Sequence, residues 1–156
     1  MKLKEENRNK KNNNKTKIIQ ENIYIEITKK EIKVNSYLKR LYDSKLGGNV
    51  VFIGTIRDKT DKGDLIDYLY YEAYKPMALN EIRKILENYL FQGAFKKGLV
   101  VHRIGILKPK DIAILVALAN EHRDNLFNVL DLIVKEIKEK VPIWKKEYFN
   151  NSYKWI

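Results

Sequence analysis

The sequence contains no cysteine, and this absence removes several kinds of chemistry at once. A chain of 156 residues without cysteine can form no disulfide, offer no thiolate to a metal ion and attack no substrate as a thiol nucleophile. It also lacks an apolar run long enough to span a bilayer and an apolar segment typical of a secretory signal. We therefore expect a cytoplasmic protein, whose sulfur chemistry, if any, would use sulfur brought by another molecule.

The signatures of several common enzyme classes are missing as well. The sequence has no P-loop, no Rossmann glycine fingerprint, no Gly-x-Ser-x-Gly and no Cys/His spacing suited to a metal. These absences argue against the usual nucleotide-binding, serine-hydrolase and zinc proteins. We expect no metal site.

Positive charge is abundant and unevenly distributed. The formal net charge is +11, and residues 1–20 hold seven basic and two acidic residues among many asparagines. Such a segment has little to bury, so we predict a disordered basic tail over 1–20 and one domain over 21–156. A solvated appendage explains the tail better than nucleic-acid binding does.

Apolar periodicity predicts the order of the elements. Alternating apolar residues, as in 23–27, or short apolar runs, as in 49–56 and 112–119, indicate strands, and spacings of three and four indicate helices. We predict strands over 23–27, 49–56, 65–73, 99–107 and 112–119, helices over 29–42, 76–90 and 123–140, and a strand or hairpin within 143–156. The short connection 108–111 predicts that the strands on either side pair antiparallel. Because strict βαβ alternation is absent, we predict an α+β fold with a mixed, mainly antiparallel sheet and three main helices.

Four sequence segments carry side chains suited to binding an anion. Thr55, Ile56 and Arg57 end a predicted buried strand, where an arginine can hold a phosphate or carboxylate with two hydrogen bonds. An ion pair of Arg57 with Asp58 or Asp61 is an equally good explanation of this spacing.

His122 and Arg123 would open the long helix, whose free N–H groups favour an anion. A capping or packing role explains them about equally well. His102 lies within a predicted strand, and we favour a structural role for it.

Lysines near the end of the chain form the last segment. Lys138 lies late in the long helix, where favourable interaction with the helix dipole is an alternative explanation. Lys145, Lys146 and Glu147 follow Pro142 and Trp144, which indicate a rigid and partly buried setting. A lysine there can lose part of its preference for the charged form and act as an acid or base.

Taken together, five segments resemble the large, catalytic subunit of molybdopterin synthase in order and spacing. The segments are Gly54–Asp58, Tyr71–Tyr74 with Met77–Ala78, His102–Gly105, His122–Arg123 and Val141–Glu147. The resemblance covers about residues 23–156. Two features depart from the family pattern: Lys110 stands where the family commonly has glycine, and the basic tail is extra.

The resemblance implies an α/β-hammerhead fold and a homodimer in which each copy binds one ubiquitin-like small subunit, giving a heterotetramer. It implies that the thiocarboxylated C-terminus of that subunit supplies two sulfurs to cyclic pyranopterin monophosphate (precursor Z), forming the molybdopterin dithiolene. No permanently bound cofactor is implied. The family's functional positions fall on Thr55–Arg57, His122, Arg123, Lys138 and Lys145–Glu147, with Lys138 and Lys145 assigned as the catalytic groups.

The predicted long helix makes a shared site necessary. If Arg123 and Lys138 lie on one helix, a rise of about 1.5 Å per residue places their backbones about 22 Å apart. We therefore expect a site built from two copies of the chain. The alternative function is a basic nucleic-acid-binding α+β module, supported by the charge and by ten tyrosines that could stack on bases.

Overall fold

The computed structural model describes residues 15–156, which form two sheets and three helices. The strands are β1 (Lys17–Ile19), β2 (Ile23–Thr28), β3 (Gly48–Thr55), β4 (Tyr68–Ala73), β5 (Lys97–Arg103), β6 (Gly105–Leu107), β7 (Ile112–Asn120), β8 (Ile143–Phe149) and β9 (Ser152–Trp155). The helices are α2 (Val34–Leu38), α3 (Lys75–Phe91) and α4 (Leu126–Lys140). This composition confirms the predicted α+β class.

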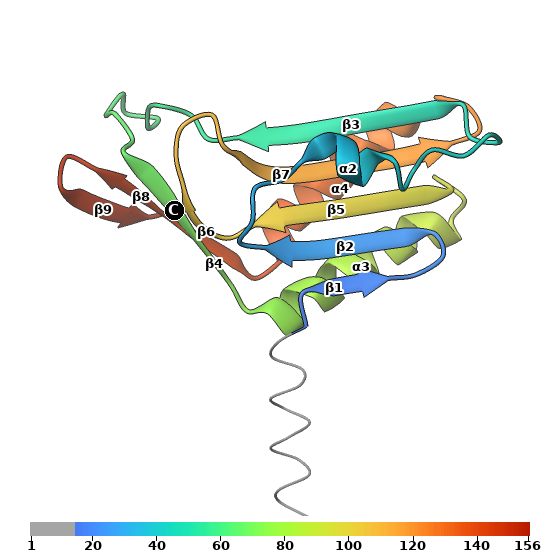
Figure 1. Ribbon diagram of the computed structural model, residues 1–156, viewed down its shortest axis with the longest axis horizontal. Helices are drawn as coiled ribbons and strands as arrows, with labels where there is room; N and C mark the ends of the chain where they lie inside the picture. Colours follow the sequence, from blue (N-terminus) through green and yellow to red (C-terminus); the bar gives the residue numbers. More distant parts are fainter. Residues whose placement is uncertain (1–14) are drawn as a thin grey trace, which may run out of the picture.

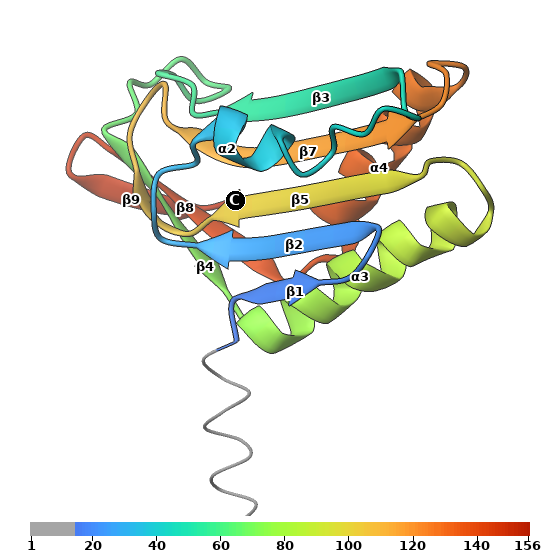
Figure 2. The same cartoon turned by 45° about the vertical axis from the view of Figure 1, so that its right-hand side comes forward.

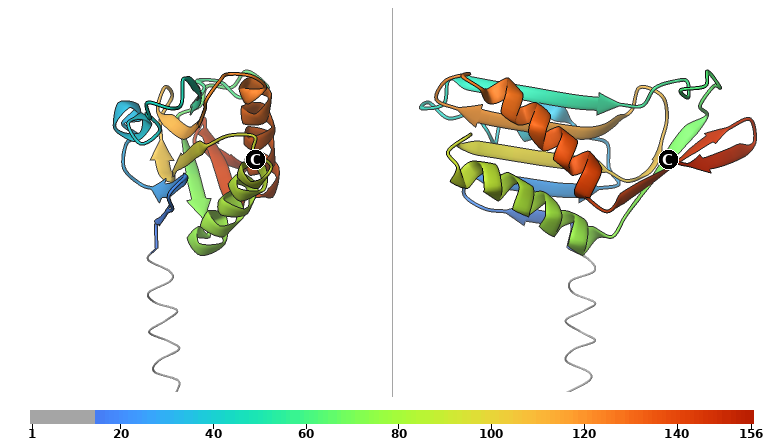
Figure 3. Two further views of the ribbon diagram at one scale, coloured as in Figure 1. Left: turned by 90° about the vertical axis from the view of Figure 1, so that its right-hand side faces the viewer. Right: turned by 180° about the vertical axis from the view of Figure 1, so that it is seen from behind.

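The larger sheet has the order β1-β2-β5-β7-β3. Strands β2 and β5 are parallel, whereas β5 and β7 pair antiparallel as predicted. Helices α3 and α4 cover one face, and α2 with its flanking loops covers the other (Figures 1 and 3). Because both faces are covered, the central strands β5 and β7 are buried along nearly their whole length.

The principal core lies between this sheet and the two long helices. Ile25, Val100 and Val116 meet Ile82 of α3 and Ile133 of α4, and all five side chains are buried. Burying apolar side chains of this size contributes about 1.5–3 kcal/mol each. This packing fixes α4 against the sheet and so determines where the end of that helix lies.

The smaller sheet has the order β6-β4-β8-β9 and lies beyond the ends of β3 and β5 (Figure 2). Residues 99–107, predicted as one strand, are instead divided between the two sheets. Gly105 has a φ of +91°, which a residue with a side chain rarely adopts. The chain bends there, so that β5 stays in the larger sheet and β6 pairs with β4 of the smaller one.

Two predicted helices differ from the structure. The helix predicted over 29–42 is reduced to α2, and the long helix begins at Leu126 instead of residue 123. Asn125 precedes α4 in the left-handed conformation, with a φ of +58°, so the helix cannot extend back through it. His122 and Arg123 therefore lie in the connection before α4.

Lys110 also adopts a left-handed conformation, with a φ of +77°. Glycine reaches this conformation without steric cost, whereas a lysine does so with strain. The turn keeps its shape because the Lys108 carbonyl accepts a hydrogen bond from the Asp111 N–H at 3.0 Å. The turn therefore accommodates a lysine in the left-handed conformation.

The predicted basic tail of residues 1–20 lies mostly outside the described residues, which begin at Lys15. Residues 17–19 do not belong to a disordered tail, because they form β1 and pair antiparallel with β2. The domain therefore starts before residue 20.

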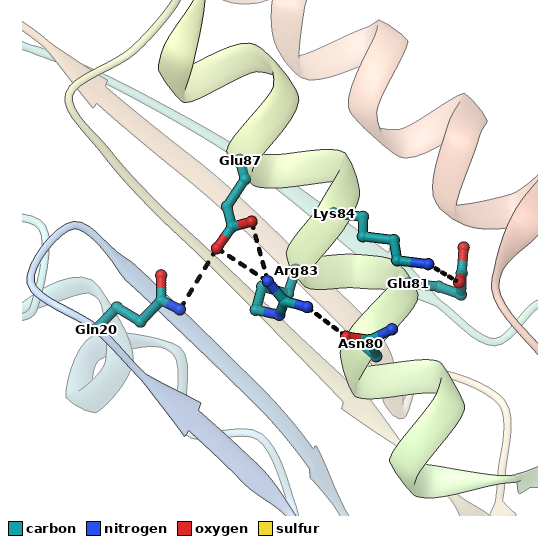
Figure 4. Close-up of polar contacts among 6 residues, drawn as sticks. All are labelled: Gln20, Asn80, Glu81, Arg83, Lys84 and Glu87. Carbon is teal, nitrogen blue, oxygen red and sulfur yellow. Dashed lines mark hydrogen bonds and ion pairs between the residues drawn. The ribbon is translucent and has the colours of Figure 1, made fainter.

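Polar side chains join this edge of the sheet to α3 (Figure 4). Gln20 follows β1, and its amide lies 3.5 Å from Oε1 of Glu87. The same carboxylate accepts two hydrogen bonds from Arg83, at 3.0 and 3.2 Å. Both bonds come from Nη1 of Arg83, while its Nη2 donates to the side-chain oxygen of Asn80. In the part of the chain that the structure describes, no helix has the length and apolar character required to cross a membrane.

The loop after α3 provides a matched test of core packing. Phe95 is completely buried and packs against Gly98, whereas Phe91 is 79% exposed. Phe95→Ala should lower the free energy of unfolding by about 3–5 kcal/mol. Phe91→Ala should change it by less than about 0.5 kcal/mol. Urea unfolding measures both, and equal losses would contradict this account of the core.

Candidate functional site

A cavity of about 560 Å³ lies where the two sheets meet the C-terminal end of α4. Strands β3, β5 and β7 contribute the wall from the larger sheet, and β4 and β8 contribute the wall from the smaller one. Its polar lining consists of Thr55, Arg57, Tyr71, His102, Lys138 and Lys145. Its apolar lining includes Phe52, Ile114, Ile137 and Ile143.

Strand alternation brings these side chains to one place. Residues two apart on a strand share a face, so Phe52 and Gly54 face the cavity from β3 while Ile143 and Lys145 face it from β8. Tyr71 of β4 stands directly opposite Lys145 in the antiparallel register. The pairing of β4 with β8 therefore places a phenol beside an amine.

Gly54 allows β3 to approach its neighbour closely at the cavity wall. A Cβ at this position would lie 2.6 Å from Cγ2 of Ile114, closer than packed atoms permit. The register between β3 and β7 shifts immediately afterwards, between Gly54 and Thr55. A bulge of this kind re-aims the residues that follow it, and the next residues along the chain include Arg57.

Arg57 lines the cavity and also forms an ion pair. Its guanidinium lies 3.0 Å from Oδ1 of Asp61, which realises the alternative suggested by the spacing of these residues. Both side chains are well exposed, so the pair contributes little to stability and can exchange partners. Arg57 is thus available to an anion that enters the cavity.

Lys138 approaches the cavity from the last turn of α4. Its Nζ lies 5.6 Å from the centre of the Phe52 ring, a distance suited to a cation–π contact. Phe52 is a cavity residue that the sequence analysis does not predict. Its position two residues before Gly54 could have indicated it, because residues two apart on a strand share a face.

Lys145 is the cationic side chain of the cavity whose protonation is most affected by its surroundings. Burial lowers its pKa, and the nearby charges of Lys138 and Arg57 act in the same direction. Glu147, two residues along β8, opposes them. A lysine in this setting exchanges a proton more readily near neutral pH than an exposed lysine does.

His102 and Tyr71 form the inner wall. The ring of His102 is buried, and its Nδ1 lies 2.8 Å from the carbonyl oxygen of Arg103. Burial lowers the pKa of His102 to about 4, so the imidazole is neutral. Burial also disfavours the charged form of Tyr71 and so raises its pKa, and the negative charge of Glu147 acts in the same direction.

Three of the predicted site residues lie beside the cavity without lining it. Ile56 is buried in a separate apolar cluster with Leu69 and Leu107. Glu147 is buried and acts on the cavity through its charge. Lys146 points to the other face of β8, where its Nζ lies 4.0 Å from the centre of the Trp155 ring.

His122 and Arg123 lie at the far end of β3 from the cavity. A Cβ on Gly48, the first residue of β3, would lie 2.9 Å from the Arg123 backbone nitrogen. Strand β3 runs from Gly48 to Thr55, a length of about 23 Å at about 3.3 Å per residue. Within one copy, therefore, the structure does not bring His122 and Arg123 to the cations of the cavity.

The arrangement as a whole suits the binding of anions in a partly apolar cavity. Arg57, Lys138 and Lys145 can each donate hydrogen bonds to phosphate or carboxylate oxygens. Attraction between opposite charges is stronger beside a low-dielectric wall than in water. Lys145 can additionally give or take a proton.

Comparison with known proteins identifies close relatives. The sequence profile of the MoaE protein family matches residues 27–140. A molybdopterin synthase catalytic subunit from Dictyostelium discoideum is 36% identical over 132 residues, covering 83% of each chain.

Solved structures of similar proteins share the fold of this chain. The crystal structure of molybdopterin synthase from Staphylococcus aureus superposes with a TM-score of 0.80 at 34% identity, covering 89% of this chain and 98% of the other. A complex of subunits 1 and 2 of molybdopterin-converting factor from Helicobacter pylori includes a chain with a TM-score of 0.71 at 18% identity, over 84% of this chain and 88% of that one. At that identity the likeness shows the fold alone.

The burial of Lys145 predicts a gain in stability when its charge is removed. Because its pKa is lowered by folding, the charged lysine costs stability at neutral pH, and this cost declines as pH rises through the folded-state pKa. Lys145→Met should therefore raise the free energy of unfolding at pH 7 by roughly 0.5–2 kcal/mol.

The matched control is Lys146→Met on the opposite face of the same strand. Lys146 contacts the Trp155 ring, so its replacement should leave the melting temperature unchanged or slightly lower. Thermal unfolding at pH 7 and pH 9.5 compares the two variants. A lower melting temperature for Lys145→Met at pH 7 would show that the buried charge is not destabilising.

Proposed function

This chain belongs to the MoaE protein family of molybdopterin synthase catalytic subunits, and we propose that it transfers sulfur to a phosphorylated pterin. In this proposal the sulfur donor is the thiocarboxylated C-terminus of a ubiquitin-like small subunit. The acceptor is cyclic pyranopterin monophosphate (precursor Z), and two transfers produce the dithiolene of molybdopterin. The observation that carries the proposal is the convergence of Arg57, Lys138 and Lys145 on one cavity.

The cations of the cavity match the charges of both reactants. A phosphate and a thiocarboxylate are anions that repel each other, and three positive side chains offset that repulsion. Arg57 and Lys138 are exposed, whereas Lys145 is partly buried. We assign the anionic groups to the first two side chains and proton transfer to the third.

The reaction needs one proton donor and one molecule of water for each sulfur. The thiocarboxylate sulfur bonds to a carbon of the pterin side chain, and the oxygen displaced from that carbon takes up a proton as it leaves. A displaced hydroxyl leaves as water, whereas a displaced ester oxygen stays on the phosphate and opens the cyclic phosphate. A molecule of water then hydrolyses the acyl–sulfur bond, which leaves the sulfur on the pterin and a carboxylate on the small subunit. Lys145, with its lowered pKa, suits the protonation step, and Lys138 suits stabilisation of the departing oxygen. No permanently bound cofactor takes part.

A second copy of the chain completes the site in this proposal. Strand β3 is an edge of the larger sheet and exposes Val51 and Ile53. An edge strand with exposed apolar side chains is suited to pairing with another strand. If two copies pair antiparallel through β3 about a two-fold axis, the Gly48 end of one lies beside the Thr55 end of the other.

That arrangement resolves the separation found within one copy. His122 and Arg123 lie at the Gly48 end, and the cavity lies at the Thr55 end. Pairing through β3 would therefore bring His122 and Arg123 of the second copy toward the cavity of the first. The proposed assembly is a homodimer with one small subunit on each copy, a heterotetramer. The alternative of a nucleic-acid-binding module has no specific feature of the described residues in its favour.

Reconstitution tests the proposed activity. The purified chain, a thiocarboxylated small subunit and precursor Z should yield molybdopterin, which is measured as its fluorescent oxidation product. Lys138→Ala and Lys145→Ala should each reduce the rate by about 10²-fold or more.

Lys135→Ala is the matched control, because Lys135 is exposed on the same helix and pairs with Asp131 at 2.8 Å. It should retain the wild-type rate. Absence of product with wild-type protein would refute the proposed activity, and an unchanged rate in Lys138→Ala would remove that residue from the mechanism.

Mixing two inactive variants tests the shared site. In a dimer of Arg123→Ala with Lys138→Ala, one cavity has its own Lys138 together with an intact Arg123 from the other copy. Random exchange of equal amounts should restore about one quarter of the wild-type activity.

The control places both substitutions in one chain and mixes it with an inactive Lys145→Ala chain, a combination that leaves no cavity complete. Native mass spectrometry verifies the exchange of subunits. No recovery in the first mixture despite verified exchange would refute the shared site.

A further inference from the structure

The orientation of the His102 ring is fixed by a backbone contact. Its Nδ1 lies 2.8 Å from the carbonyl oxygen of Arg103. A carbonyl oxygen can only accept a hydrogen bond, so Nδ1 must carry the hydrogen and donate it. In a neutral imidazole the other nitrogen, Nε2, then has a lone pair and no hydrogen.

The surroundings of the ring keep it neutral and hold it in place. Only 7% of His102 is exposed, and Tyr71 packs edge-on against it with 5.2 Å between the ring centres. The positive charge of Lys145 further disfavours a charged imidazole. Among residues 15–156, Nε2 has no hydrogen-bond partner, although the residue lines the cavity.

His102 is chemically unlike the cationic side chains around it. Arg57, Lys138 and Lys145 donate hydrogen bonds and, while charged, accept none. The hydroxyls of Thr55 and Tyr71 can rotate between donating and accepting. Nε2 is therefore a fixed, uncharged acceptor on a residue that lines the cavity and packs against the ring of Tyr71.

We propose that His102 binds the substrate through Nε2, which accepts a hydrogen bond from an N–H group of the heterocycle. This inference rests on the proposed function, and it adds a group that recognises the uncharged part of the molecule. In this proposal the exposed cations Arg57 and Lys138 hold the anionic groups, and the flat ring lies against His102 and Tyr71. A site that pairs with a substrate N–H discriminates against analogues lacking it, because its own acceptor would otherwise remain unpaired.

Two amide substitutions distinguish the role of Nδ1 of His102 from that of Nε2. In His102→Asn the new amide nitrogen can replace Nδ1 and donate to the Arg103 carbonyl, but nothing replaces Nε2. His102→Gln has a longer side chain that can place its amide oxygen, an acceptor, near the position of Nε2. If His102 has only a structural role, His102→Asn should be tolerated better than His102→Gln. If Nε2 accepts a hydrogen bond from the substrate, His102→Gln should be tolerated better.

The experiment measures kcat and KM for precursor Z in the reconstituted system, and the affinity of each variant for the small subunit. His102→Asn should raise KM for precursor Z by about tenfold, while His102→Gln should stay within about threefold of wild type. The affinity for the small subunit should not change in either variant. Equal KM values in wild type and His102→Asn would overturn the inference, and so would a loss confined to small-subunit affinity.

Nitrogen NMR tests the same point without any change at His102. The chain has only two histidines, His102 and His122, so the signals can be assigned by comparison with His122→Ala. His102 should show the tautomer with hydrogen on Nδ1 and should not titrate between pH 5 and pH 8. Hydrogen on Nε2 would overturn the inference even if both amide variants failed to fold. Since this measurement needs no activity, its outcome is separate from that of the reconstitution.

Discussion

The antiparallel pairing of β4 with β8 is the constraint on which the cavity depends. It joins residues far apart in the chain and sets Tyr71 directly opposite Lys145. The sheet that contains this pair lies beyond the ends of β3 and β5, whose cavity-facing residues Phe52 and His102 form the opposite wall. Without this crossing of two sheets, Lys145 would be one of many exposed lysines. The bend at Gly105 makes the crossing possible, because it lets the chain leave one sheet and enter the other.

The site combines exposed and buried positive charge, and each has a different consequence. Arg57 and Lys138 remain in contact with solvent, so they cost the fold little and can attract anions from a distance. Lys145 is partly withdrawn from water, which destabilises its charged form and lowers its pKa. The buried charge of Lys145 lowers the stability of the fold and provides a group suited to proton transfer. Functional sites often combine activity with reduced stability in this way. Neutral His102 adds a polar contact without adding a further charge.

Much of the fold follows from local patterns, and the remainder depends on contacts between distant residues. Period-2 alternation identified β2, short apolar runs identified β3 and β7, and Pro76 marked the start of α3. The run 99–107 is apolar except at His102, Arg103 and Gly105, and periodicity alone could not show that it serves two sheets. The same alternation could have shown that Lys145 and Lys146 point to opposite faces of β8. No local pattern places Arg123 beside Gly48, since that contact joins a loop to the start of a distant strand.

The central claim is that two copies of the chain share each cavity, and chemical cross-linking tests it most directly. Because the sequence has no cysteine, an Arg123→Cys chain and a Thr55→Cys chain each carry a single thiol. After the two chains have exchanged subunits at random, about half of the dimers are heterodimers. A short thiol-specific linker should join most of these covalently, with little cross-linking in either chain alone. If a stable dimer forms but the mixture gives no covalent product, His122 and Arg123 do not reach the cavity of the second copy, and the shared site is wrong.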